Sequence, residues 1–159
     1  MLSLCPCKFT NPAYHLASMK QPYNAADTNM EEKQKEFNFW NDHSLEFLEM
    51  AMKRDYQESV HKSHGYGKAS RECGDTIEFF IMTDKDKLSA VSYDIKGCIY
   101  THACANTIIE LVKDKTAAQA LDIDSKQIIT YLKTLPEKEH HCAVLALKAF
   151  KLALSSLDT

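Results

Sequence analysis

The sequence predicts an α+β fold in which helices pack on one face of a small antiparallel sheet of about three strands. Three observations support this prediction. A helical pattern opens the organised part of the chain, two alternating apolar segments with a short polar connection follow, and the pattern then stays helical to the end. The length of 159 residues and the hydrophobic fraction of 45% suit one globular domain with its own core.

Residues 1–37 differ in composition from the rest of the chain. They hold three of the four prolines and show no periodic apolar pattern, so we predict an extension that is disordered or lies over the domain. Cys5 and Cys7 lie in this extension without other ligands nearby and are interpreted as functionally silent. The organised domain is assigned to residues 38–159.

The first helix is predicted in "FNFWNDHSLEFLEMAMKRD". Asn41 or Asp42 can cap it, and its apolar stripe comprises Leu45, Leu48 and Met52 with Phe47 and Ala51. The stretch over residues 61–75, "HKSHGYGKASRECGD", is rich in turn-forming residues. It is predicted to be an irregular edge strand or a loop.

Two strands are predicted next from period-two alternation. In "TIEFFIMT", Ile77, Phe79 and Ile81 fall on one face, and in "LSAVSYDI" the corresponding residues are Val91, Tyr93 and Ile95. The polar connection "DKDK" is short, and the two segments have similar lengths. We therefore expect an antiparallel hairpin.

Four helical segments follow from His102 onward. The first, "HACANTIIELVKD", is amphipathic, and the second, "TAAQALD", is a short helix or turn. The third, "DSKQIITYLKTL", has Asp124 or Ser125 as its cap. The last, "CAVLALKAFKLALSSL", is apolar except for a stripe at Lys148 and Lys151, so we expect it to be largely buried.

Charge and hydropathy exclude several classes of function. A net charge of −3 gives no electrostatic case for binding nucleic acid, and no apolar run approaches the roughly 20 residues that span a bilayer. The first residues lack the pattern of a secretory signal. Because the chain has six cysteines without such a signal, we expect a reducing compartment, by default the cytoplasm.

Three cysteines lie at the ends of predicted elements, where proteins usually display functional side chains. Cys73 precedes a strand, with Asp75 two residues on, Cys98 lies between a strand and a helix, and Cys142 opens the last helix. The positive end of a helix favours the thiolate form at Cys98 and Cys142. Thiolates bind metals and attack sulfur.

The spacing of these residues leaves two interpretations open. Three thiolates and the Asp75 carboxylate would suit zinc or a small iron–sulfur cluster, but their long separations differ from paired zinc motifs and fit three unrelated cysteines as well. Cys104 is interpreted as buried packing and His102 as a capping or surface residue. His141, next to Cys142, is an alternative ligand to Asp75 or an exposed residue.

Several segments in order resemble the IscU/NifU-like family of iron–sulfur cluster assembly scaffolds. They are "CGDTIEFFI", "SYDIKGC", "ACANTIIELVKDKTAAQALDI" and "LKTLPEKEHHCAVLALKAFKLAL", and the likeness covers roughly residues 40–157. The resemblance implies the fold of these scaffolds. It also implies that Cys73, Cys98 and Cys142 are the cluster-binding cysteines, with Asp75 as the carboxylate ligand and His141 as the nearby histidine.

The function implied by the resemblance is transient assembly of a [2Fe–2S] cluster. Cys142 and Cys98 would accept sulfur from a cysteine desulfurase, iron and electrons would come from donor proteins, and acceptor apoproteins would receive the cluster. Zinc is expected to fit the same site. We expect a scaffold or carrier rather than an enzyme, acting as a monomer or a weak homo-oligomer.

Other interpretations remain. Zinc-dependent transfer of persulfide sulfur, working with a cysteine desulfurase, would use the same residues, and a structural-zinc interaction module would need none of this chemistry. One departure from the family concerns the stretch before Cys142, which often reads Leu-Pro-Pro-Val-Lys. Here it is "LPEKE", with Glu139 in the place of the lysine, which puts recognition by an Hsp70-type chaperone in doubt.

Overall fold

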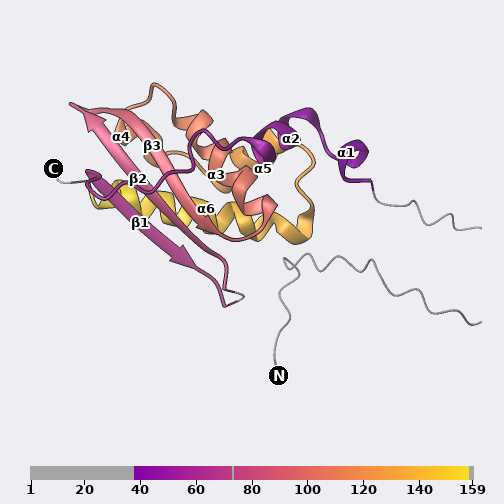
Figure 1. Cartoon of the computed structure of the whole chain (residues 1–159). Helices are drawn as coiled ribbons and strands as arrows, with labels where there is room; N and C mark the ends of the chain where they lie inside the picture. The colour runs from indigo at the N-terminus through magenta and orange to yellow at the C-terminus, as the bar shows by residue number, and fades with distance from the viewer. Residues whose placement is uncertain (1–37, 73, 158–159) are drawn as a thin grey trace, which may run out of the picture.

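The computed structural model of the chain describes residues 38–72 and 74–157. Their elements confirm the predicted α+β class (Figure 1). In chain order they are α1 (Phe39–Asp42), α2 (Leu45–Met52), β1 (Gly65–Ser70), β2 (Thr76–Asp84), β3 (Lys87–Lys96), α3 (Ile99–Val112), α4 (Ala117–Leu121), α5 (Ser125–Leu132), the 3-10 helix η1 (Glu137–Glu139) and α6 (His140–Ser155). The predicted extension over residues 1–37, with Cys5 and Cys7, lies outside the described residues.

The sheet is antiparallel with the strand order β1-β2-β3. β2 and β3 form the predicted hairpin, in which Phe79 pairs with Tyr93. Ile77, Phe79 and Ile81 are completely buried, so the predicted inward face of β2 is confirmed. The edge of the sheet at β3 is covered by another segment, which protects it from pairing with other chains.

Residues 56–58 cover the outer edge of β3. Tyr93 N–H donates to the carbonyl of Tyr56, and Glu58 N–H donates to the carbonyl of Tyr93, both at 2.9 Å. This segment follows α2, so the connection between α2 and β1 adds a short bridge to the sheet.

The other edge strand, β1, is more regular than the sequence predicted. All six of its residues pair with β2, and its glycines let the backbone of α6 lie against it. A Cβ atom on Gly67 would lie 2.2 Å from the carbonyl oxygen of Ala149. Only glycine permits this close approach between strand and helix.

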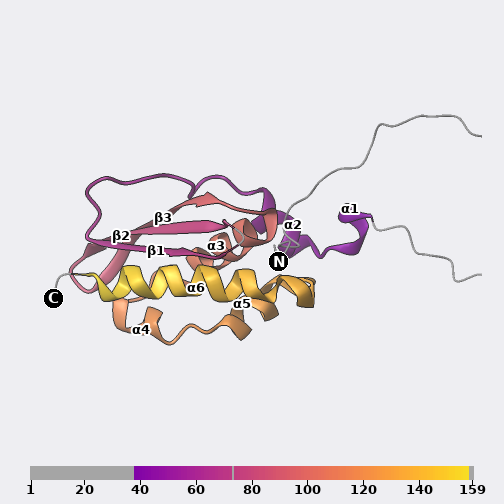
Figure 2. The same ribbon diagram turned by 90° about the horizontal axis from the view of Figure 1, so that it is seen from below.

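The helices that contact the sheet lie on one of its faces, as predicted. α6 runs along β1 and β2, α3 packs against β3 and α6, and α2 and α5 contact α3 from farther out (Figure 2). Phe79 and Phe150 meet edge to face in the core, with their ring centroids 5.5 Å apart. The long helix α6 is therefore held by the sheet on one side and by other helices around it.

The prediction for the first helix was wrong about its start. The cap of α2 is Ser44, whose Oγ accepts a hydrogen bond from Phe47 N–H, and α1 is a separate short helix. Because α2 begins at Leu45, its buried side chains are Phe47, Met50 and Ala51. Leu45 and Met52, placed in the apolar stripe, are 77% and 45% exposed.

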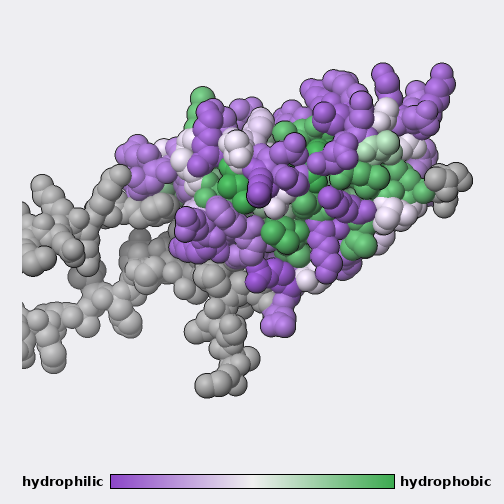
Figure 3. Space-filling view, turned by 180° about the vertical axis from the view of Figure 1, so that it is seen from behind, coloured by the Kyte–Doolittle hydropathy of each residue, from purple (hydrophilic) through white to green (hydrophobic). Residues whose placement is uncertain are grey.

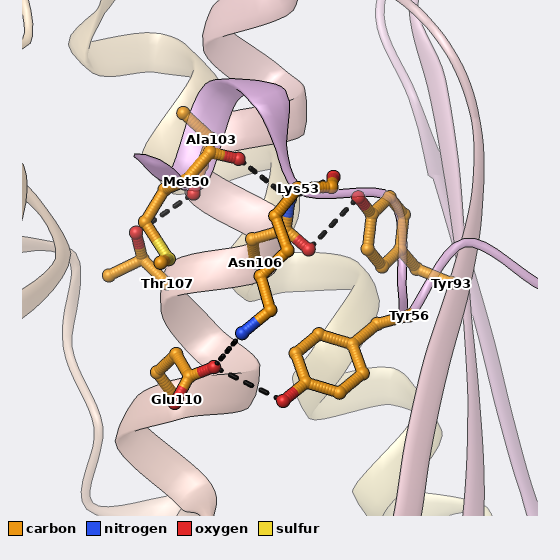
Figure 4. Close-up of polar contacts among 8 residues, drawn as sticks. All are labelled: Met50, Lys53, Tyr56, Tyr93, Ala103, Asn106, Thr107 and Glu110. Atoms are coloured by element: carbon orange, nitrogen blue, oxygen red, sulfur yellow. Dashed lines mark hydrogen bonds and ion pairs between the residues drawn. The ribbon is translucent and has the colours of Figure 1, made fainter. Parts of the chain in front are cut away.

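A buried polar network joins the end of α2 to α3 and β3 (Figure 4). The Asn106 amide group donates to the carbonyls of Met50 and Lys53 at 2.7 and 3.0 Å. Its oxygen accepts a hydrogen bond from the hydroxyl of Tyr93 at 3.1 Å. Beside this network, the Lys53 ammonium and the Tyr56 hydroxyl both contact the carboxylate of Glu110.

His102 belongs to the same network, so its assignment as a capping or surface residue was wrong. The ring is 7% exposed, and its Nδ1 lies 2.5 Å from the Tyr93 hydroxyl oxygen. Because the Tyr93 proton goes to Asn106, His102 Nδ1–H is the donor in this contact. Burial, together with the charge of Arg54, lowers the pKa of His102 to about 4 and keeps the ring neutral.

Large hydrophobic side chains that stay exposed are scattered over the described surface. Figure 3 shows one face of the molecule, on which hydrophobic patches are separated by hydrophilic residues. None of the helices in the described part of the chain is both long enough and apolar enough to cross a membrane.

Candidate metal centre

Cys98 and Cys142 converge on one point of the structure. Cys98 is the N-cap residue of α3, and Cys142 is in the first turn of α6. Their Sγ atoms lie 3.8 Å apart, although 44 residues separate them in the sequence. Cys142 is completely buried and Cys98 partly so, which gives the pair limited access to solvent.

The convergence follows from how the two helices begin. β3 ends at Lys96, so Cys98 lies immediately beyond the end of a strand, and α3 packs against α6. Both helices are long, and no side chain of the described residues caps their N-terminal ends, where the two cysteines lie. Two positive helix ends at one place favour negatively charged side chains there.

The pKa values of the two thiols are shifted in opposite directions. The contact with Cys142 and a second with the Thr101 hydroxyl, 3.4 Å away, lower the pKa of Cys98 to about 6. The same contact with Cys98, and then burial, raise the pKa of Cys142. Of the two thiols, Cys98 is therefore the one that loses its proton first, while Cys142 keeps its own and donates it toward Glu139 Oε2.

Glu139 is a third member of the cluster. It is the N-cap residue of α6, it is 1% exposed, and its Oε2 lies 3.8 Å from Cys142 Sγ. One ligand atom each from Cys98, Glu139 and Cys142 lie within 4.8 Å of one another. Sequence reasoning treated Glu139 only as a departure from a family pattern. Its position three residues before Cys142 could have indicated this role, because that spacing places both side chains on one side of a helical turn.

Asp75 lies beside this cluster. The Oδ2 atom of its carboxylate is buried without a hydrogen-bond partner among the described residues. Its Cγ would be 3.6 Å from a Cβ atom on Gly97, the residue before Cys98. Asp75 is not in the three-residue group within 4.8 Å, and Cys73 lies outside the described residues. A shared site of Cys73, Asp75, Cys98 and Cys142 therefore stays a prediction.

The other candidates occupy different positions. His141 Nδ1–H donates to the carbonyl of Lys138 at 2.8 Å, which leaves Nε2 facing Glu139 Oε2 at 3.8 Å. Its role as an alternative ligand remains a prediction. Cys104 is completely buried in the core, and burial raises its pKa. Its interpretation as packing is confirmed.

The geometry of the three-residue group suits a metal ion. For a tetrahedral ion with metal–sulfur bonds of about 2.3 Å, two sulfur ligands lie about 3.8 Å apart, and the two thiols have this separation. Two sulfur atoms and a carboxylate leave a fourth tetrahedral position for another ligand. The group can therefore hold a divalent ion, or iron that carries sulfide.

The chain resembles known proteins over most of this domain. A family model described as NifU-like N terminal domain matches residues 53–158. The iron–sulfur cluster assembly protein IscU of Plasmodium falciparum is 34% identical over 90 residues, which cover 57% of this chain and 54% of that protein. The nitrogen fixation protein NifU of Nostoc sp. is 31% identical over 84 residues, covering 52% of this chain but only 28% of NifU.

Solved structures share the fold at lower identity. A putative iron–sulfur cluster assembly scaffold protein for the SUF system from Fervidobacterium islandicum has a TM-score of 0.60 and 20% identity, covering 74% of this chain and 99% of that one. A NifU-like N-terminal structure from Brucella abortus also has a TM-score of 0.60, with 13% identity and coverage of 72% and 92%. These likenesses concern the three-stranded sheet and its helices.

Proposed function

The chain belongs to the family of NifU-like N-terminal domains, and from this membership we propose that it is a scaffold for assembly of a [2Fe–2S] cluster. In this proposal, sulfur comes from a cysteine desulfurase, iron and electrons come from donor proteins, and the finished cluster passes to acceptor apoproteins. The observation that supports it best is the contact between Cys98 and Cys142 at the ends of two helices. Relatives named as an iron–sulfur cluster assembly protein and as an assembly scaffold protein add to this support.

Sulfur transfer would begin at a thiolate. The Cys98 thiolate attacks the outer sulfur of the desulfurase persulfide, the donor S–S bond breaks, and the desulfurase cysteine leaves as a thiolate. Cys142 is the second acceptor candidate, and its proton must leave before it can react. The electron donor then reduces the transferred sulfur to sulfide, which joins iron as the cargo of the scaffold.

The cluster would be held by Cys73, Cys98 and Cys142, with Asp75 as the fourth ligand and His141 as its alternative. Stable iron–sulfur carriers generally use four cysteines. A carboxylate oxygen is a harder ligand that matches this soft chemistry less well. We therefore propose a site that binds the cluster and also releases it, in a carrier without turnover chemistry of its own.

Anaerobic reconstitution with iron and sulfide tests this function. We expect visible charge-transfer absorption in the wild-type protein and its loss in Cys73→Ala, Cys98→Ala and Cys142→Ala. Cys104→Ala is the matched control, because it removes a thiol that belongs to the core. An unchanged cluster in both Cys98→Ala and Cys142→Ala would contradict the proposal.

The same preparations distinguish the alternatives. Tight zinc that iron cannot displace, with stimulation of a desulfurase that the cysteine variants lose, would favour zinc-dependent sulfur transfer. Absence of iron uptake and a melting temperature unchanged by chelators would indicate an interaction module.

A further inference from the structure

The carboxylate of Glu139 lies at the metal-binding face of the thiol pair rather than on the surface. We infer that Glu139 is a direct ligand, together with Cys98 and Cys142, of a divalent ion such as Zn²⁺ or Fe²⁺ in the cluster-free protein. The role of this ion in the cell rests on the proposed function. Metal binding itself can be tested separately.

The distances between the three ligand atoms support direct coordination. Cys142 Sγ lies 3.8 Å from both Cys98 Sγ and Glu139 Oε2. A tetrahedral ion with metal–sulfur bonds of about 2.3 Å and metal–oxygen bonds of about 2.0 Å would place sulfur and oxygen about 3.5 Å apart. The three atoms lie within 4.8 Å of one another, so an ion would need to draw the Glu139 oxygen only a short distance closer to the sulfurs.

Burial distinguishes Glu139 from its neighbours. Carboxylates are rarely fully buried unless a cation, a metal or hydrogen bonds compensate the charge. Glu139 is 1% exposed, whereas Glu137 and Lys138 in the same turn η1 are exposed. A hydrogen bond from Glu139 N–H to the carbonyl of Pro136, at 2.8 Å, helps to fix this turn. The turn therefore directs one of its two carboxylates toward the thiols.

The charges at this point favour a cation. Cysteines bind a metal as thiolates and release their protons on binding, so two cysteines and one carboxylate side chain supply three anionic ligands to an ion held there. The two helix ends compensate part of this charge, and a divalent ion placed between the three ligands compensates most of the rest. A site with two sulfurs and one oxygen suits zinc or ferrous iron better than a metal that prefers only sulfur.

Zinc and cobalt binding to the full chain tests the inference. We expect Glu139→Gln to weaken Zn²⁺ binding at least about tenfold, since loss of even an outer-shell partner typically costs 10–100-fold in metal affinity. Co²⁺ provides a spectroscopic probe: the sulfur-to-cobalt charge-transfer band should persist in the variant, while the visible d–d bands shift. Glu137→Gln is the control, because it makes the same change on the exposed side of the turn.

A second measurement does not depend on how the variant folds. X-ray absorption of the zinc-loaded wild-type protein should show oxygen at about 2.0 Å as well as sulfur at about 2.3 Å. Zinc surrounded by sulfur alone, or equal affinity in wild type and a folded Glu139→Gln protein, would overturn the inference.

Failure of the inference can be told apart from failure of the proposed function. A wild-type protein that assembles a cluster but binds neither zinc nor cobalt would disprove the ligand role and leave the scaffold function intact. A protein that binds zinc through Glu139 but never assembles a cluster would disprove the scaffold function and leave the ligand role of Glu139 intact.

Discussion

Cys98 Sγ lies 3.8 Å from Cys142 Sγ, yet the two thiols differ in their electrostatic environment. Cys98 contacts Cys142 and the Thr101 hydroxyl, whereas Cys142 is completely buried and its S–H donates toward Glu139 Oε2. The pair therefore separates into a thiolate that is partly accessible and a thiol that is not. This asymmetry gives the two cysteines different chemical reactivity in the metal-free protein.

We predict that Cys98 reacts with iodoacetamide well before Cys142 at pH 7. Only the thiolate reacts, and the pKa of Cys98 is lowered to about 6 by its hydrogen bonds. The Cys98 thiolate is therefore mostly present above pH 6, and the alkylation rate should fall as the pH drops through this value. Peptide mapping by mass spectrometry, over a series of pH values and in the presence of a chelator, measures both rates.

The Cys142→Ala variant provides the control for this reactivity. It removes the contact that does most to lower the pKa of Cys98. The pH at which alkylation of Cys98 is half-maximal should therefore rise. Cys104 should stay unmodified in the folded protein because it is completely buried. Faster labelling of Cys142 than of Cys98 would contradict the assignment of the thiolate.

Sequence patterns predicted the fold class and the inward face of β2 because these depend on local periodicity. The alternation of Ile77, Phe79 and Ile81 with other residues predicts which face of β2 is buried, and all three side chains are buried. The start of α2 was missed because several residues that can cap a helix precede it. Ser44 caps α2, while its hydroxyl also donates to the carbonyl of Leu132, and no local pattern reveals that tertiary contact.

Polar residues in the interior were the hardest to predict. Glutamate is almost never fully buried unless it is paired, and histidine is intermediate, yet both Glu139 and His102 are buried by contacts between different elements. His102 meets Tyr93 across the space between α3 and β3. The cysteines at element ends could be selected from the sequence, whereas the contact between Cys98 and Cys142 depends on how α3 packs against α6.

We predict that Asp75→Ala lengthens the lifetime of a bound cluster. If Asp75 is the fourth ligand, its oxygen forms the weakest bond to the cluster. Its carboxylate lies beside Gly97, and its Oδ2 is buried without a hydrogen-bond partner among the described residues. The decay of visible absorption in the presence of a chelator measures this lifetime. Glu72→Ala, which removes a nearby exposed carboxylate, serves as the control, and a shorter lifetime for Asp75→Ala would contradict this account of release.

Gly67→Ala should destabilise the protein by about 3 kcal/mol, at the upper end of the usual cost of overpacking. The new Cβ atom would lie 2.2 Å from both Ala149 O and Ala153 N, which belong to the backbone of α6. Urea unfolding followed by circular dichroism measures the loss.

Gly97→Ala is the matched control for this substitution, because its nearest contacts would be 3.4 Å or longer. Since α6 also carries Cys142, metal affinity should fall in Gly67→Ala even where the protein still folds. A melting temperature equal to that of the wild type would show that β1 does not depend on close contact with α6.

The last prediction concerns Asn106, which connects α2, α3 and β3. Asn106→Ala should lower the free energy of unfolding by about 3 kcal/mol, because each buried polar group left without a partner costs about 1–3 kcal/mol. The substitution removes the donors to the carbonyls of Met50 and Lys53 and the acceptor for the Tyr93 hydroxyl. Thr107→Val, one residue away, should cost about 1 kcal/mol or less, because the Thr107 hydroxyl bonds to the carbonyl of Ala103 within its own helix. Urea unfolding of both variants measures the difference, and equal losses would show that Asn106 is not the residue that joins the three elements.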